Sequence, residues 1–284
     1  MTNVQAESHF IPSTDGTKLH VLTTGPRNNG YPSIFFLHGF GQSLYSWSPQ
    51  LEDPVLTRRF HLVAIDLRGH GQSDKPTQQE AYQNGQQWAE DIRAVMDALE
   101  LDRVVLVGWS YGGIFICDYL RAFGEDRLAA VVFVDASFDV GIAETMHLLG
   151  PEFLALGPGM SSDDTAIASR AISKFVDIMG FKPLEPRVRY EIIGCIFTLT
   201  PDTRRAMSTA KRSGQPQLAE VTVPTMVMQG REDMVVTKES AKWLVERVRH
   251  AKYIEYRECG HVPFLEKAAM FNKDLEKFVT SVDL

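Results

Sequence analysis

The stretch Gly108-Trp109-Ser110-Tyr111-Gly112 is the most informative part of this 284-residue sequence. It has the pattern G-x-S-x-G, directly follows the apolar run Val104–Gly108 and opens a helical stretch at 112–123. In such a strand–turn–helix, the turn is tight enough to exclude bulky side chains at the glycine positions, and the serine projects beyond the carboxyl end of the strand. This context makes Ser110 a candidate nucleophile, which the pentapeptide alone would not.

Other short apolar runs lie on both sides of this turn. Runs of this length, bounded by glycine or turn residues, are typical of buried strands. We expect strands at His20–Thr24, Ser33–Leu37, His61–Asp66, Val104–Gly108, Ala130–Asp135 and Thr225–Gln229, and an alternating edge strand at Lys252–Arg257. Helical periodicity lies between several of them, as in 88–99, 112–123 and the stretch from Phe271 to Phe278. Buried strands that alternate with helices predict an α/β fold with a mostly parallel sheet.

The alternation of strands and helices stops between Ser137 and Val223, where no buried strand is evident. A loop of this length without secondary structure would be improbable. We therefore predict that 137–223 is a helical insertion lying over the sheet, and that 1–136 and 224–284 together form the core.

The composition excludes several classes of protein. The chain has 29 Lys+Arg and 36 Asp+Glu, a net charge of −7, which argues against a nucleic-acid partner. Its three cysteines, Cys117, Cys195 and Cys259, are too scattered for a disulfide framework or a zinc site. No apolar stretch approaches the roughly 18 residues that span a bilayer, and the first residues lack a leader pattern. We expect a cytoplasmic protein with no metal, cofactor or membrane partner; the oligomeric state stays open.

A serine hydroxyl needs a base to become a nucleophile, and the base needs an acid to orient it. His261 follows the expected strand Lys252–Arg257, and Asp233 follows Thr225–Gln229. Both lie just beyond the carboxyl ends of strands, where open α/β sheets bind their ligands. Asp135 also ends a strand and is the alternative acid.

These motifs together resemble the α/β-hydrolase fold family, in its serine-nucleophile branch. Besides the turn around Ser110, the resemblance rests on HGFGQS (38–43), DLRGHGQSDKP (66–76), GREDMVV (230–236) and GHVPFLEKAAMF (260–271). It covers about residues 15 to 280. The insertion at 137–223 stands where this family carries its variable cap domain.

The resemblance implies a role for each site residue. Ser110 would be the nucleophile, His261 the base and Asp233 the acid, because Gly230-Arg231-Glu232-Asp233 fits the family's acid turn better than the surroundings of Asp135 do. The backbone N–H groups of Phe40 and Tyr111 would form the oxyanion hole. Phe40 and Trp109 are candidates for the substrate pocket, although Trp109 could equally pack beneath the turn.

Serine at position 110 disfavours the family's epoxide and halide reactions, which use a carboxylate nucleophile. The resemblance then implies an esterase or cofactor-free haloperoxidase-like enzyme that hydrolyses an ester, lactone or thioester through an acyl-serine. Carbon–carbon bond hydrolysis, perhydrolysis and a non-catalytic binding role are the alternatives. The insertion is rich in large apolar side chains, and pockets are mostly apolar, so a hydrophobic substrate is expected. These side chains are Met146, Leu148, Leu149, Phe153, Leu154, Met179, Phe181, Ile192 and Phe197.

Overall fold

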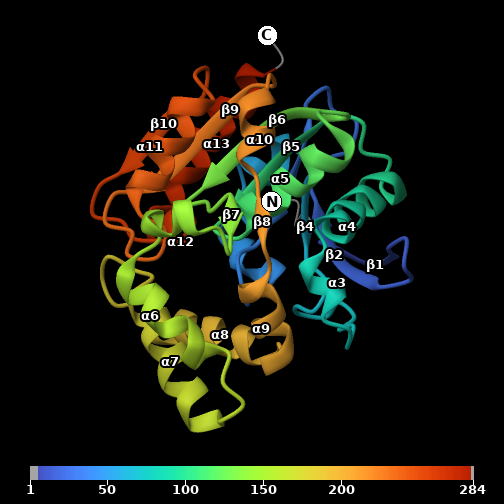
Figure 1. The fold of residues 1–284 in the computed structure, drawn as a ribbon. Helices are drawn as coiled ribbons and strands as arrows, with labels where there is room; N and C mark the ends of the chain where they lie inside the picture. The colour runs from blue at the N-terminus through green and yellow to red at the C-terminus, as the bar shows by residue number, and fades with distance from the viewer. Residues whose placement is uncertain (1–5, 283–284) are drawn as a thin grey trace.

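An eight-stranded sheet runs through the protein in the order β1-β2-β4-β3-β5-β6-β9-β10 (Figure 1). The computed structural model describes residues 6–282. The strands are β1 (Glu7–Pro12), β2 (Lys18–Thr24), β3 (Ser33–Leu37), β4 (Leu62–Ile65), β5 (Val104–Trp109), β6 (Leu128–Val134), β9 (Thr225–Gly230) and β10 (Lys252–Tyr256). The pairs β1–β2 and β2–β4 are antiparallel and all other neighbours are parallel. The predicted α/β-hydrolase fold with a mostly parallel sheet is confirmed.

The strands expected from the apolar runs are all present, with β10 at one edge of the sheet. Strand β1, at the other edge, was not predicted. Its sequence ESHFIP is polar and mostly exposed, so it lacks the apolar signal of the central strands. Only its antiparallel pairing with β2 makes it a strand.

Alternate residues of the central strands face opposite sides of the sheet, so each side has its own apolar core. Phe35 and Leu106 belong to one core, and Phe36 and Val107 to the other. The first is covered by α4 (Gly85–Ala98), α5 (Gly112–Phe123), α10 (Gln215–Glu220) and α11 (Lys238–Arg247), and the second by α13 (Ala268–Ser281) and the short helices η1 (Leu44–Trp47), α2 (Leu56–Arg59) and α12 (Pro263–Glu266). The helices α1 (Ser48–Leu51) and α3 (Glu80–Gln83) complete this part of the chain.

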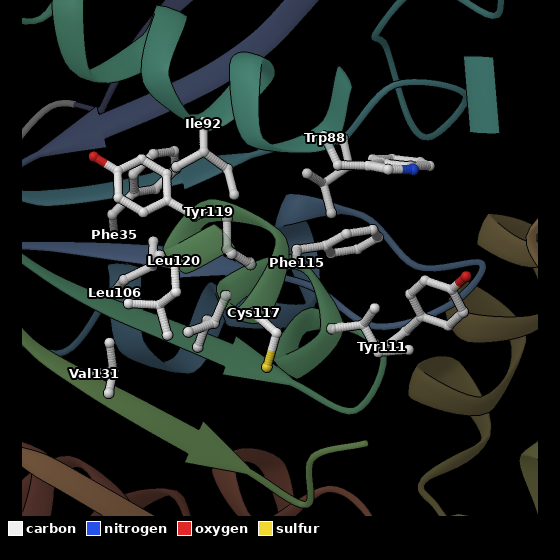
Figure 2. Close-up of a cluster of buried hydrophobic side chains, with 14 of the residues drawn as sticks. Phe35, Trp88, Ile92, Leu106, Tyr111, Phe115, Cys117, Tyr119, Leu120 and Val131 are labelled. Atoms are coloured by element: carbon white, nitrogen blue, oxygen red, sulfur yellow. The ribbon is translucent and has the colours of Figure 1, made fainter. Parts of the chain in front are cut away.

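Helix α5, which follows Ser110, is apolar on nearly all sides and lies between α4 and the sheet. Figure 2 shows its side chains Phe115, Tyr119 and Leu120 between Trp88 and Ile92 of α4 and the strand residues below. The Trp88 and Phe115 ring centroids are 4.6 Å apart. Burying side chains of this size stabilises the fold by about 1.5–3 kcal/mol each, so the helix behind Ser110 is held firmly.

The segment 137–223 consists mainly of the helices η2 (Ala143–Leu148), α6 (Pro151–Met160), α7 (Thr165–Asp177), α8 (Pro186–Phe197) and α9 (Pro201–Thr209), followed by α10. Of these, α6, α7, α8 and α9 are grouped at one end of the molecule in Figure 1. A two-residue antiparallel pair, β7 (Asp139–Val140) with β8 (Arg212–Ser213), joins the two ends of this segment and was not predicted. None of the described helices has the length and apolar content that crossing a membrane would require.

The expectation about a leader depends partly on residues 1–5, which lie outside the described residues.

The loop after β4 is anchored by buried charges. Asp66 accepts hydrogen bonds from the N–H of Leu44 (2.8 Å) and of Gln72 (2.9 Å). Arg68 is completely buried; its Nε and Nη2 each lie 2.7 Å from an oxygen of Asp91 on α4. Burial raises the pKa of Asp91, so this carboxylate depends on the guanidinium.

We expect Arg68→Ala to lower the free energy of unfolding by about 3–5 kcal/mol, because it leaves Asp91 buried without its partner. Urea unfolding followed by circular dichroism measures the loss. The control is Arg187→Ala, which removes a fully exposed pair with Glu191 and should leave the unfolding midpoint unmoved. A loss below about 1 kcal/mol for Arg68→Ala would show that the Arg68–Asp91 pair does not hold the loop.

Candidate active site

Ser110 stands at the turn between β5 and α5 in a conformation that few non-glycine residues adopt. Its φ is +56°, in the left-handed region. A Cβ on Gly108 would lie 2.5 Å from the carbonyl oxygen of Gly112, and one on Gly112 would lie 2.8 Å from that of Leu37. Both glycines are therefore required by close backbone contacts, as the sequence pattern predicted.

Backbone hydrogen bonds hold this turn in place. The N–H of Ser110 donates to the carbonyl of Val134 on β6 (2.9 Å), and the Ser110 carbonyl accepts from Gly113 and Ser137 at 3.0 Å each. The strain at Ser110 is thus balanced by bonds to three neighbouring segments, and the side chain is directed from a rigid support.

His261 and Asp233 are brought together, although 28 residues separate them in the chain. The Nδ1 of His261 lies 2.8 Å from Oδ2 of Asp233, and both side chains are buried. A ring nitrogen facing a carboxylate carries the proton, so Nε2 of His261 is left free to act as a base. This is the geometry that the base and acid assignments need.

Asp233 has partners that the sequence did not reveal. Its Oδ1 accepts from the N–H of Val235 (2.7 Å) and of Val236 (3.1 Å), and its Oδ2 also accepts from Nε2 of Gln229 (3.3 Å). The two amides belong to the turn GREDMVV, whose resemblance to an acid turn is the signal that could have indicated them. Gln229 gave no signal, because it ends an ordinary apolar strand.

The loop that carries His261 is fixed from both sides. The indole Nε1 of Trp109 donates to the His261 carbonyl (2.8 Å), and the N–H of His261 donates to the carbonyl of Met179 in the insertion (2.6 Å). Trp109 is buried, packs against Phe264 and does not line the cavity described below. Of the two positions open to Trp109, the structure has the one beneath the turn, so it is not a pocket residue.

The loop after β3 brings Phe40 beside Ser110. A Cβ on Gly39 would lie 3.0 Å from that of Ser110. Within the described part of the chain, the N–H groups of Phe40 and Tyr111 form no hydrogen bond to another residue. Both residues line the same cavity as Ser110. Two unused donors beside a serine can stabilise an oxyanion, which is the role that the resemblance implied for them.

His38 and His70 shape this loop. The Nδ1 of His38 donates to the carbonyl of Gly39 (2.8 Å), and the N–H of Gly41 donates to Nε2 of His70 (3.3 Å). Burial lowers the pKa of both rings, that of His70 to about 3, so both are neutral near pH 7. These two histidines are therefore structural hydrogen-bonding groups.

The side chain of Tyr111 connects the turn to the insertion. Its hydroxyl donates to the carbonyl of Met207 (2.9 Å) and accepts from Nη2 of Arg212 (2.6 Å). Arg212 also pairs with Asp118 on α5. A buried ion pair therefore fixes the insertion to the helix behind Ser110.

A cavity of about 680 Å³ lies between the insertion and the sheet, and Ser110 is on its wall. Five of the apolar residues singled out in the insertion line it, namely Met146, Leu148, Leu149, Phe153 and Leu154. Met179, Phe181, Ile192 and Phe197 are not on its wall. Polar side chains come from Arg205, Ser208 and Thr209, at the end of α9, and from Ser161, Ser162 and Asp163.

Asp135, the alternative acid, lies next to the pair but holds a different partner. Its Oδ1 accepts from the N–H of Gly230 (2.7 Å), whereas the imidazole of His261 is bonded to Asp233. One atom each of Asp135, Asp233 and His261 lie within 4.8 Å of one another, a grouping of metal-ligand types. The His261–Asp233 hydrogen bond already uses two of these side chains, as a catalytic pair would.

The comparisons with known proteins agree with this architecture. A sequence model of the alpha/beta hydrolase family matches residues 34–273, and the chain belongs to this family. The esterase RhEst1 from Rhodococcus sp. ECU1013 has a similar structure, with a TM-score of 0.88, 29% identity and coverage of 97% of this chain and 99% of that one.

Two curated relatives are similar over most of their length. The bifunctional esterase/perhydrolase DCH from Acinetobacter calcoaceticus is 26% identical over 286 residues, 96% of this chain and 99% of the relative. The 2-hydroxymuconate semialdehyde hydrolase from Pseudomonas sp. (strain CF600) is 24% identical over 285 residues, 93% of this chain and 94% of the relative.

Proposed function

We propose that this protein is a serine hydrolase that cleaves an ester, lactone or thioester of a small hydrophobic molecule through an acyl-enzyme. The observation that carries the proposal is the convergence of three features. Ser110 stands on a strained turn at the wall of an apolar cavity, two unused N–H groups lie beside it, and the buried pair His261–Asp233 follows the ends of the adjacent strands.

In the proposed mechanism, Nε2 of His261 takes the proton of the Ser110 hydroxyl as Oγ attacks the substrate carbonyl. Asp233 holds the imidazole and stabilises its charged form. The N–H groups of Phe40 and Tyr111 bind the developing oxyanion, each worth about 3 kcal/mol of transition-state stabilisation. The protonated His261 then gives its proton to the leaving group, and water releases the acyl group by the same steps in reverse.

The cavity supports a hydrophobic substrate. Most of its wall is aliphatic or aromatic, and a volume of about 680 Å³ suits a small molecule. The residues 137–223 contribute much of this wall, which fits their proposed role as a cap that determines specificity.

The likeness to the bifunctional esterase/perhydrolase supports hydrogen peroxide as a second acceptor of the acyl group. In that reaction hydrogen peroxide replaces water in attacking the acyl-serine and forms a peracid, with the same residues in the same roles. The likeness to the 2-hydroxymuconate semialdehyde hydrolase supports carbon–carbon bond hydrolysis as a further reaction to test. Hydrolysis of p-nitrophenyl esters, with and without peroxide, and of vinylogous diketones distinguishes these reactions from a non-catalytic binding role.

We expect Ser110→Ala to lower kcat for p-nitrophenyl butyrate by up to about 10⁶-fold, because the attacking oxygen is lost and the triad acts as a unit. Initial rates and labelling with a fluorophosphonate probe measure the effect. The matched control is Ser46→Ala, which lies outside the cavity and should keep activity and labelling. Substantial turnover by Ser110→Ala would exclude this serine as the nucleophile.

We expect Gly157→Leu to lower the activity toward esters with longer acyl chains relative to that toward acetate esters. Gly157 lies in α6 on the cavity wall, and a Cβ there would meet no atom within 4 Å, so the leucine side chain has room to enter the cavity. The ratio of kcat/KM for the hexanoate ester to that for the acetate ester should fall by about tenfold or more.

Gly194→Leu is the matched control for the cavity. Gly194 lies on α8, its Cβ would also meet no atom, and it is outside the cavity wall. This variant should keep the wild-type ratio. Equal ratios for all three proteins would show that the acyl chain does not occupy the cavity beside Gly157.

A further inference from the structure

Asp135 has a buried carboxyl group in which only one oxygen has a hydrogen-bond partner. Its Oδ1 accepts the hydrogen bond from Gly230, while its Oδ2 is buried and receives no hydrogen bond from any described residue. Its backbone φ is +41°, an uncommon value that a non-glycine residue adopts only under constraint. An unpartnered, buried carboxylate oxygen beside the catalytic pair calls for a chemical explanation.

Asp233, its neighbour, is supplied with donors on both oxygens. Four hydrogen bonds reach it, from His261, Gln229, Val235 and Val236. Two carboxyl groups this close cannot both be ionised without strong repulsion, so they share one proton. Both oxygens of Asp233 already accept hydrogen bonds, whereas Oδ2 of Asp135 has no donor, so the shared proton belongs on Asp135.

The groups around Asp135 include no basic side chain other than His261. Facing it are Asp233 after β9, His261 and Cys259 in the loop after β10, Glu266 on α12, and Tyr253 and Tyr256 on β10. Burial raises the pKa of Asp135 well above its ordinary range, and the neighbouring Asp233 carboxylate raises this pKa further. No lysine or arginine is among these groups.

We propose that Asp135 is a positioning residue that stays protonated at neutral pH and donates a hydrogen bond from Oδ2 to the carboxylate of Asp233. The bond would hold Asp233 in the orientation in which it binds Nδ1 of His261, and it would leave a single negative charge beside the imidazole. No proton leaves Asp135 during turnover. The proposal rests on the proposed function, because its kinetic test depends on His261 acting as the catalytic base.

The variant Asp135→Asn separates a neutral acid from an ionised one. Its amide oxygen can accept from Gly230 and its NH₂ can donate to Asp233, so it reproduces the neutral carboxyl in both contacts. We expect kcat within about threefold of wild type, and the acidic limb of the kcat/KM profile unmoved to within about 0.3 pH unit, since the charge beside His261 is unchanged.

An ionised Asp135 would give the opposite result. Its replacement by Asn would remove a negative charge from beside His261, so the acidic limb of the kcat/KM profile would move to lower pH by about one unit or more. Such a shift, or a loss of kcat in Asp135→Asn as large as that in Asp135→Leu, would overturn the proposal.

Asp135→Leu removes the donor and puts an apolar side chain in its place. We expect kcat to fall by about ten- to hundredfold with KM unchanged, the effect of losing a hydrogen bond to a charged group. Asp274→Asn on α13, outside the cavity, is the matched control and should keep activity within about twofold.

An infrared difference spectrum tests the protonation state without any substrate. Wild type minus Asp135→Asn at pH 7 should contain the carbonyl-stretching band of a protonated carboxyl, and its absence would overturn the proposal. Because this measurement does not use Asp135→Leu, it tests the proposal even if that variant does not fold. If esters are not hydrolysed but the band is present, the proposed function fails while the protonated Asp135 stands.

Discussion

The close packing of β5 against α5 is the constraint on which the site depends. A Cβ on Gly108 would collide with the carbonyl of Gly112 at the start of α5, and a Cβ on Gly112 would collide with that of Leu37 on the neighbouring strand β3. Of the two residues between β5 and α5, Tyr111 has an ordinary helical φ, whereas Ser110 is held in the left-handed region at the turn. Ser110 is reactive in the proposed mechanism because of where this packing puts it, on a support that cannot relax.

Buried polar groups hold the other loops at the same edge of the sheet. Asp66 organises the loop after β4, and the neutral rings of His38 and His70 organise the loop after β3 that carries Phe40. Arg212 joins the insertion to the helix behind Ser110 through Asp118 and the hydroxyl of Tyr111. Each of these groups is costly to bury, so each is paired, and the pairing gives the loops one arrangement instead of several.

Two neighbouring carboxyl groups of the site have different surroundings. Asp233 collects hydrogen bonds from two backbone amides, a glutamine and His261. Asp135 lies beside it with an oxygen that lacks a donor, and burial disfavours a second charge there. In the proposed arrangement, a charged acid and a neutral acid that follow adjacent strands serve one histidine, since their surroundings differ in the number of donors.

The sequence by itself determined the central strands and the candidate catalytic residues, because these depend on local patterns. Short apolar runs mark the central strands, and the glycines around Ser110 and the turns around Asp233 and His261 are local requirements of the backbone. Strand β1 was not predicted, because its polar residues form a strand only by pairing with β2. The roles of Trp109, Gln229 and Asp135, and which apolar residues of 137–223 face the cavity, were decided by tertiary structure alone. Each depends on which segment, distant in the chain, comes within hydrogen-bonding or packing distance, and one-dimensional periodicity carries no such information.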